Sequence, residues 1–245
     1  MKAARTVLRG ESGGNAAYLK SETVNILYED NHLIIINKKC GEIVQADPSG
    51  DAPLEQTVKE YLKEKYDKSG EVFLGVVHRV DRPVSGIVMF ARTSKAQLRI
   101  NRMFQEKLIR KTYWAVVKDL PPDEAGTLTH YIVRNKKVKR SYASIEERNG
   151  SKKAVLHYRH ITSSDRYHLL EIDLETGRHH QIRCQLSAIG CPIRGDLKYG
   201  YPRSNPNGGI SLHARQIQFK HPVKDEDINL IAPLPDDPFW IFFDK

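Results

Sequence analysis

The segment FLGVVHRVDRPVSGIVMFARTSK, residues 73–95, places charged side chains between two apolar runs. These charged or titratable residues are His78, Arg79, Asp81 and Arg82. The apolar flanks have the composition of β-strands, and Pro83 and Gly86 indicate a turn between them. A turn does not need an acid between two arginines. Two flanking guanidinium groups are expected to hold Asp81 in its ionised form. The turn is therefore either a salt-bridged surface loop or a site that uses a carboxylate.

A second candidate segment is LETGRHHQIRCQLSAIGCPIRGDLKYG, residues 174–200. Its pattern predicts a helix from Gly177 to about Ile189, with Thr176 as the N-cap. Arg183 falls at the edge of the apolar stripe of this helix. From this segment alone, Arg183 is either a solvated helix charge or a residue of a site.

The start of this predicted helix carries Arg178, His179 and His180. A helix N-terminus with an arginine and two histidines is suited to binding phosphate. A metal site is the alternative, but adjacent histidines point apart on a helix and the chain has no HExxH spacing. The three cysteines are scattered, which is typical of buried thiols and not of a disulfide framework or a zinc site. No metal is therefore expected.

The third segment is RKTYWAVV, residues 110–117, which has the pattern of a strand. Alternation along a strand places Tyr113 on the same face as Ala115 and Val117. Tyr113 is then either an ordinary core tyrosine or a ring that lines a site between strands.

The elements that position these segments do not alternate regularly between strands and helices. A hairpin is predicted around Asp30 and Asn31. Helices are predicted at residues 51–70, opened by Asp51, and from Ser94 as N-cap. Three consecutive antiparallel strands are predicted between residues 123 and 162. Strands outnumber helices, which predicts an α+β fold: one catalytic domain with a mostly antiparallel mixed sheet, flanked by helices and loops.

The composition is that of a soluble, basic protein. The 245 residues are 40% hydrophobic and 28% charged, with a net charge of +9. Such a charge favours polyanionic partners, among them RNA, DNA and anionic membrane surfaces. Residues 1–25 are polar and predict an N-terminal tail, followed by a domain over residues 26–245. No apolar run is long enough for a signal peptide or a membrane span, so a cytoplasmic location is expected.

Taken together and in this order, the motifs resemble those of the RluA-type pseudouridine synthase family. The motifs are HRVDRPVSG, KTY, TGRHHQIR with GCPIRGDLKYG, and LHARQIQFKHP. The resemblance extends from about residue 25 to the end of the chain. It implies the α+β fold of that family, here as a stand-alone catalytic domain without the S4 RNA-binding module that larger relatives carry.

The resemblance also implies roles for individual residues. Asp81 matches the catalytic aspartate, and Arg183 matches the basic residue paired with it. Tyr113 matches the tyrosine that contacts the uracil, and Ile182 the apolar residue that packs on the pyrimidine. Arg79 matches an arginine that enters the RNA as the target base leaves. The remaining residues expected to bind substrate are His78, Arg82, Arg178 and His180.

The implied reaction converts a specific uridine in tRNA or rRNA to pseudouridine. It is an isomerisation, so no cofactor is expected, and the implied partner is an RNA stem-loop bound by a monomer, with no protein partner and no membrane. A non-catalytic RNA-binding factor on the same fold is the alternative function. A metal-dependent nuclease is a third, disfavoured because the sequence has no clustered acidic or histidine ligands.

The sequence departs from the family pattern at a few positions. Residues 37–41 read Asn-Lys-Lys-Cys-Gly, where the family usually has Asn-Lys-Pro-x-Gly, and Gln45 stands where a histidine is common. Val84 and Gln185 occupy positions where threonine and histidine are frequent. These departures affect the first loop and polar contacts around the site. None of them falls on a matched catalytic position.

Overall fold

The computed structural model describes residues 24–243 of the chain. Its first strands are β1 (Ile26–Glu29), β2 (Leu33–Lys38), β3 (Gly75–Val76), β4 (Ser85–Ala91), β5 (Arg110–Val117) and β6 (Ala125–Asn135). The later strands are β7 (Arg140–Ser144), β8 (Lys152–Ser163), β9 (His168–Leu174), β10 (Leu212–Lys220) and β11 (Asp227–Ile231). The helices are α2 (Leu54–Lys65), α3 (Ser94–Gln105), α4 (Gln181–Ala188), the short 3₁₀ helix η1 (Leu197–Tyr199) and α5 (Pro238–Ile241).

Within residues 24–243, all eleven strands form one sheet. The strand order is β1-β2-β4-β10-β5-β9-β8-β6-β7, with β11 paired to β10 and β3 paired to β4. Strands β4 and β10 pair in parallel, and the other strand pairs of this sheet are antiparallel. The α+β class with a mostly antiparallel mixed sheet is therefore confirmed.

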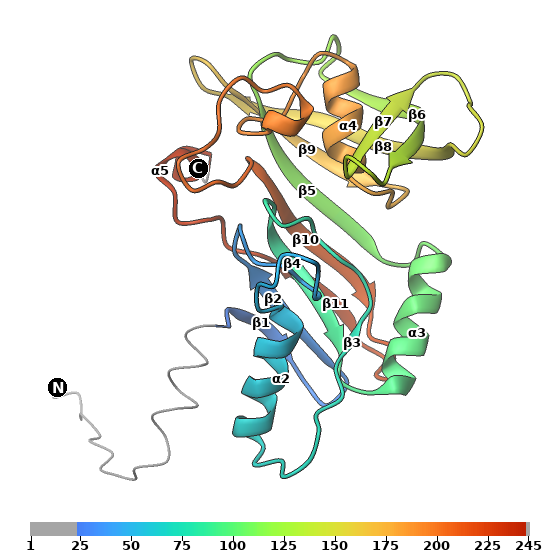
Figure 1. Cartoon of the computed structure of the whole chain (residues 1–245), viewed down its shortest axis with the longest axis vertical. Coiled ribbons are helices and arrows are strands. Elements are labelled where there is room, and N and C mark those ends of the chain that lie inside the picture. The colour runs from blue at the N-terminus through green and yellow to red at the C-terminus, as the bar shows by residue number, and fades with distance from the viewer. Residues whose placement is uncertain (1–23, 244–245) are drawn as a thin grey trace, which may run out of the picture.

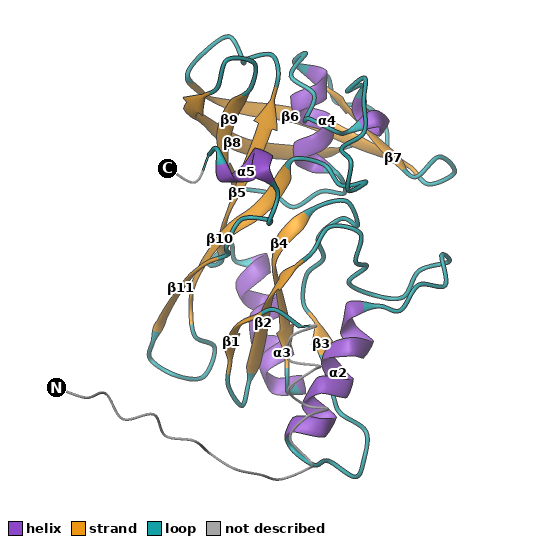
Figure 2. Cartoon of the chain, turned by 90° about the vertical axis from the view of Figure 1, so that its left-hand side faces the viewer, coloured by secondary structure: helices purple, strands orange, loops and turns teal. Residues whose placement is uncertain are grey.

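The sheet gives the molecule an elongated shape (Figure 1). Strands β1 to β4 and helices α2 and α3 make up its lower part, and strands β6 to β9 with α4 make up the upper part (Figures 1 and 2). Strands β5 and β10 join the two parts. A residue on β5, or in a loop next to the start of β4, therefore lies near the junction of the two parts.

The core is centred on two strands with continuous apolar sequences. All seven residues of β4 are buried, as are Leu33 to Ile36 of β2. Strands buried on both faces have this kind of uninterrupted apolar run. The apolar positions of α2 that face the core are Leu54, Val58, Tyr61 and Leu62. These contacts hold the strand that follows the HRVDR loop rigidly in place.

The first two helices begin at different residues from those predicted. Helix α2 begins at Leu54, directly after a proline with extended backbone, and not at Asp51. The N-cap of α3 is Thr93 and not Ser94, because the Thr93 hydroxyl accepts a hydrogen bond from the Ala96 amide at 3.1 Å. Both threonine and serine are good N-caps, so the sequence alone did not separate them.

Helix α4 is shorter at its N-terminus than predicted. It begins at Gln181 instead of Gly177, because His180 has a left-handed backbone with φ of 54° and cannot continue the helix. Thr176 does not cap it. The Thr176 hydroxyl accepts from the Val155 amide at 2.8 Å and so ties the preceding loop to β8.

The turn that carries HRVDR leads directly into β4. The apolar run before it forms only the two-residue strand β3, shorter than the predicted strand. Gly86 in β4 has φ of +108°, and a Cβ there would lie 2.4 Å from the main-chain oxygen of Ala214 in β10. Only glycine fits this conformation and this close approach. Gly86 therefore permits the parallel pairing that sets the direction of the turn.

The three predicted antiparallel strands are confirmed as β6, β7 and β8, with β6 in the middle. The predicted polar tail falls almost entirely on residues outside those described, and Val24 is already buried in the core. Residues 24–243 contain no S4 module beside the sheet and its helices. No helix in this part of the chain is long and apolar enough to cross a membrane.

Candidate active site

A buried lysine holds the loop that carries Asp81 through hydrogen bonds to main-chain carbonyls. Lys38, at the end of β2, is 1% exposed. Its ammonium donates hydrogen bonds to the carbonyls of Lys39, Arg82 and Val84 at 2.8, 3.2 and 2.7 Å. The Val84 amide donates to the carbonyl of Asp81 at 3.0 Å, which closes the turn. Burial lowers the pKa of Lys38 to about 8. The backbone on both sides of Asp81 is thereby held in one conformation.

Asp81 forms an ion pair with Arg183 across the site. Arg183 Nη1 lies 3.1 Å from Asp81 Oδ2, and the two residues are 102 positions apart in the chain. Arg183 is 5% exposed, so it is not a solvated helix charge. The Asp81 side chain is 30% exposed, so its carboxylate is still accessible from the solvent.

A second acid, Asp196, holds the same arginine. Arg183 Nε and Nη2 donate to Asp196 Oδ2 and Oδ1 at 2.7 and 2.8 Å, a bidentate arrangement with well-defined geometry. Asp196 is 1% exposed. Burial opposes the charged form of Arg183, but the hydrogen bonds and charges of Asp196 and Asp81 outweigh it and raise the pKa of Arg183. Arg183 is therefore a fixed cation that points its remaining nitrogen at Asp81.

His180 lies on the same side of Asp81. Its Nε2 is 3.5 Å from Asp81 Oδ2, and its Nδ1 is 2.8 Å from the Tyr199 hydroxyl. Burial lowers the pKa of His180 to about 3, so the ring is neutral at physiological pH. The left-handed turn at His180 directs its ring toward Asp81, and the predicted binding of phosphate at the start of this helix stays a prediction.

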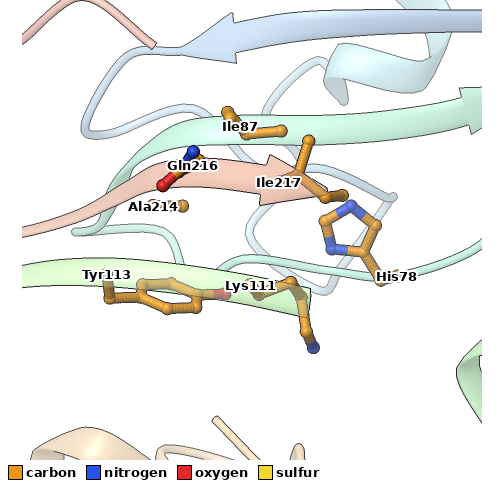
Figure 3. Close-up of a pocket in the computed structure, with 7 residues that line it drawn as sticks. All are labelled: His78, Ile87, Lys111, Tyr113, Ala214, Gln216 and Ile217. Carbon is orange, nitrogen blue, oxygen red and sulfur yellow. The ribbon is translucent and has the colours of Figure 1, made fainter. Parts of the chain in front are cut away.

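Tyr113 on β5 is 8% exposed and lies between β9 and β10 in the sheet, paired with Ile172 and Ala214. Burial, together with the negative charge of Asp81, raises the pKa of its hydroxyl. The side chain lines a small cavity of about 10 Å³ (Figure 3). The other residues that line this cavity are His78, Ile87, Lys111, Ala214, Gln216 and Ile217. Such a volume accommodates about one water molecule.

His78 has a structural contact within this cavity wall. Its Nε2 accepts a hydrogen bond from the Met89 amide at 3.0 Å, and its ring packs against Phe104. Burial lowers the pKa of His78 to about 3. His78 is therefore a neutral ring that joins the HRVDR loop to β4 and α3, and its predicted contact with substrate stays a prediction.

The arginines that flank Asp81 do not pair with it as the sequence suggested. Arg82 Nη2 lies 2.7 Å from Asp51 Oδ2, with both side chains about half exposed. Arg79 is exposed. Arg82 lies in the turn that the Val84 amide closes on the Asp81 carbonyl, and its side chain pairs with Asp51 instead of Asp81. The cation that pairs with Asp81 is Arg183, contributed by α4.

The remaining predicted binding residues are Arg178 and Ile182. Arg178 is exposed, and its Nε donates to the Lys153 carbonyl at 3.1 Å. Ile182 is 4% exposed and belongs to the main core cluster. The three residues proposed for catalysis thus lie at one junction: Asp81 in the loop before β4, Tyr113 on β5 and Arg183 on α4.

Sequence reasoning missed Lys38, Asp196 and Tyr199. The segment GCPIRGDLKYG was recognised as part of a motif, but no role followed for its acid or its tyrosine. Each of the three acts through a contact distant in the sequence, and no local periodicity encodes such a contact. Within residues 24–243, no group of three or more His, Cys, Asp or Glu side chains is placed to hold a metal ion.

The fold and this junction define a class of protein: a mixed-sheet enzyme domain with one accessible carboxylate beside a fixed arginine. A family model described as RNA pseudouridylate synthase matches residues 32–188, a segment that includes Asp81, Tyr113 and Arg183. The chain belongs to the RNA pseudouridylate synthase family, whose members are isomerases.

Individual relatives support this membership. A Synechocystis protein named as an uncharacterized RNA pseudouridine synthase is 34% identical over 86% of this chain and 66% of its own length. The ribosomal large subunit pseudouridine synthase D of Vibrio cholerae is 32% identical over 87% of this chain and 68% of its own length. The solved structure of human RNA pseudouridylate synthase domain containing 4 covers 94% of both chains with a TM-score of 0.74 and 25% identity. The chain thus spans about two thirds of the length of the Synechocystis and Vibrio cholerae relatives.

Proposed function

We propose that this protein converts a uridine in a structured RNA to pseudouridine, and that Asp81 acts on the ribose. The observation that carries the proposal is the ion pair between Asp81 and Arg183 at 3.1 Å, with the Asp81 side chain still 30% exposed. Arg183 compensates the charge of a half-buried carboxylate, which is costly to leave without a partner. A carboxylate that is charged and accessible can act as a nucleophile or a base.

The proposed reaction breaks the bond between N1 of the uracil and C1′ of the ribose, turns the base, and joins C5 to C1′. The hydrogen on C5 leaves as a proton and N1 gains one, so the atoms of substrate and product are the same. A glycosidase uses two carboxylates because it protonates a leaving group and activates water. Here the uracil is retained and water is not a reactant, so one carboxylate suffices. Asp81 either attacks C1′ or removes a proton from the ribose. Tyr113 offers a ring edge and a hydroxyl to the uracil, and Arg183 stabilises the charge of Asp81 throughout.

The choice of RNA belongs to the same proposal. A base inside a helix is out of reach of Asp81 and must leave the stack, and Arg79 is exposed next to Asp81 in the loop, where it can occupy the vacated space. Several relatives are named for the large ribosomal subunit, which favours rRNA over tRNA as the target. We further propose that the protein acts as a cytoplasmic monomer with a domain over residues 26–245. Pseudouridine maps of rRNA and tRNA with and without the gene identify the target.

One experiment separates this function from its rivals. The protein is incubated with uridine-containing RNA and Mg²⁺, with and without excess EDTA, and pseudouridine content and chain length are both measured. We expect pseudouridine in RNA of unchanged length. Binding without pseudouridine, in every RNA that the maps indicate, would support a non-catalytic RNA-binding factor. Shortened RNA that disappears on adding EDTA would support a metal-dependent nuclease.

The tyrosine gives the first variant test. Tyr113→Phe keeps the ring but removes the hydroxyl that lies within the field of Asp81. If the hydroxyl takes part in proton transfer, the single-turnover rate falls by about 10² with little change in RNA affinity. Tyr113→Leu removes the ring as well and is expected to weaken binding too. A wild-type rate in the Phe variant would show that Tyr113 only packs.

A strongly basic hairpin lies beside the proposed site. The end of β6, the turn that follows it and the first residue of β7 have the sequence RNKKVKR, residues 134–140, and residues 134–139 are exposed. Its position is fixed by Lys198, which donates to the Lys139 carbonyl at 3.2 Å, and by Arg140, whose guanidinium lies 5.2 Å from the Tyr199 ring centre. The hairpin therefore presents its charges close to Tyr199, which contacts His180. We propose that it binds RNA phosphates.

Removing the positive charges of this hairpin is expected to lower the affinity for RNA and to make that affinity less dependent on salt. Each phosphate contact contributes about −0.7 to the slope of log affinity against log salt for single strands. The triple variant Lys136→Gln, Lys137→Gln and Lys139→Gln is expected to reduce the magnitude of the slope by about 1 to 2. A matched control changes Lys63, Lys68 and Lys95, exposed lysines on or near α2 and α3, to Gln. An equal loss in both triple variants, measured between low and physiological salt, would contradict a specific role for the hairpin.

A further inference from the structure

The closest contacts of the protein with the proposed catalytic carboxylate fall on one of its two oxygens. Arg183 Nη1 at 3.1 Å and His180 Nε2 at 3.5 Å both approach Asp81 Oδ2. In the described part of the chain, no hydrogen bond involves the Oδ1 atom of Asp81. The two oxygens of Asp81 are therefore different: Oδ2 is held by the protein, and Oδ1 is available to a substrate.

The hydroxyl of Tyr199 fixes which nitrogen of His180 carries the hydrogen. Tyr199 Oη accepts a hydrogen bond from the main-chain amide of Ser141 at 2.9 Å and lies 2.8 Å from His180 Nδ1. An amide can only donate, so the hydroxyl keeps its own hydrogen for another partner. His180 Nδ1 is in place to accept it. The ring hydrogen of a neutral His180 is then on Nε2, which faces Asp81 Oδ2.

The ring of His179 carries its hydrogen on the other nitrogen, Nδ1. His179 stacks on His180 with ring centres 3.8 Å apart and an angle of 18° between planes. The Ser141 hydroxyl donates to the main-chain oxygen of His179 and lies 2.8 Å from His179 Nδ1. Because its hydrogen is already used, this hydroxyl accepts from His179 Nδ1. Ser141 of β7 thus sets both rings, one through its hydroxyl and the other through its amide and Tyr199.

The groups around His180 keep it neutral. Burial is the largest effect and lowers its pKa to about 3. The charged or titratable groups that act on His180 are Asp81 from the loop before β4, Arg183 from α4, His179 from the preceding residue and Lys198 from η1. Asp81 favours protonation, and the other three oppose it.

We propose that Tyr199 is a positioning residue, which holds neutral His180 with its Nε2 hydrogen directed toward Oδ2 of Asp81 and so leaves Oδ1 as the reacting oxygen. The role in the reaction depends on the proposed function, whereas the state of His180 does not. Asp196 and Tyr199 both lie in the GDLKYG segment. One segment therefore orients both partners of Asp81: Asp196 holds Arg183, and Tyr199 holds His180.

The first test needs no RNA. Nitrogen NMR of protein with ¹⁵N-labelled histidine distinguishes protonated from unprotonated ring nitrogens. We expect His180 of the wild type to carry its hydrogen on Nε2 near neutral pH, and Tyr199→Phe to lose this single form and to raise the pKa of His180. Tyr158→Phe, a change at another buried tyrosine, is the control and should leave His180 unchanged. A hydrogen on Nδ1 in the wild type would overturn the proposal.

The second test measures activity. Tyr199→Phe keeps the ring that lies 5.0 Å from the Arg183 guanidinium, so the fold is expected to survive. The single-turnover rate should fall about tenfold, the size of one lost hydrogen bond, with RNA affinity unchanged. An unchanged rate in Tyr199→Phe would overturn the positioning role. If the wild type modifies no RNA at all, the proposed function fails while the NMR result still stands.

A pair of substitutions at His180 separates positioning from a purely structural role. The amide nitrogen of Gln reaches about as far as Nε2 and can donate to Asp81, whereas that of Asn corresponds to Nδ1 and cannot. The left-handed backbone at His180, with φ of 54°, instead favours Asn over Gln. We expect His180→Gln to have a higher single-turnover rate than His180→Asn. Adding Tyr199→Phe to His180→Gln should leave that rate unchanged. A faster His180→Asn would mean that His180 serves the backbone turn, and would overturn the proposal.

Discussion

Asp81→Asn protein is expected to fold, to bind RNA with wild-type affinity and to form no measurable pseudouridine. An amide can neither attack C1′ nor accept a proton from the ribose, so the rate is expected to fall by on the order of 10⁴ or more. The fold should persist, because the loop is held by Lys38 through main-chain carbonyls and not through the Asp81 side chain. Single-turnover assays on the mapped RNA, with binding measured in parallel, give the comparison.

The matched control is Asp165→Asn, a change at an exposed acid in the turn between β8 and β9. It alters the net charge by the same amount and should leave both rate and affinity unchanged. If Asp81→Asn keeps even a tenth of the wild-type rate, the catalytic group must be sought elsewhere. Loss of affinity in this variant alone would instead assign Asp81 to binding.

Arg183→Met is expected to reduce both stability and activity. The change removes the partner of two carboxylates at once, and Asp196 is 1% exposed. Removing one member of a buried ion pair leaves an uncompensated charge and costs about 3–5 kcal/mol of the free energy of unfolding. The rate should fall by on the order of 10³, because Asp81 loses the cation that holds it. Denaturant unfolding and single-turnover assays measure the two effects separately.

A double variant distinguishes these two consequences. Arg183→Met with Asp196→Leu removes the stranded buried charge, so most of the lost stability should return. Replacing a buried ion pair by apolar residues of similar volume is often nearly neutral. The activity should stay low, since Asp81 still has no cation beside it. Recovery of activity together with stability would show that Arg183 is only structural.

The sequence was most informative where neighbours in the chain are also neighbours in space. The strands of residues 123–162, the turn before Ser85 and the fold class could be predicted because apolar alternation and turn residues are local signals. The motifs also brought Asp81, Tyr113 and Arg183 into one hypothesis. The structure then placed these three residues around one junction of the sheet.

The remainder depends on contacts between distant segments. Nothing local shows that Arg82 pairs with Asp51, or that Lys38 binds carbonyls of the loop 44 and 46 residues away. The start of α4 was predicted too early in the chain. Histidine rarely adopts a left-handed backbone, so no local signal indicated that the helix begins only after His180. Local propensity sets the elements, but long-range hydrogen bonds set the last turn of a helix and the partner of a charge.

The lysine clamp and the unbroken sheet make the site a stiff receptor. One ammonium holds the loop of Asp81 at two of its carbonyls, and β5 and β10 connect both sides of the site within a single sheet. If the protein does not change conformation on binding, the RNA has to change its conformation instead. On the proposed function, the cost of extracting the base, about a few kcal/mol, is then borne by the RNA. Uridines in loops, bulges or weak pairs are consequently the accessible targets. The low energy needed to unstack and unpair such a uridine then contributes to the specificity of the enzyme.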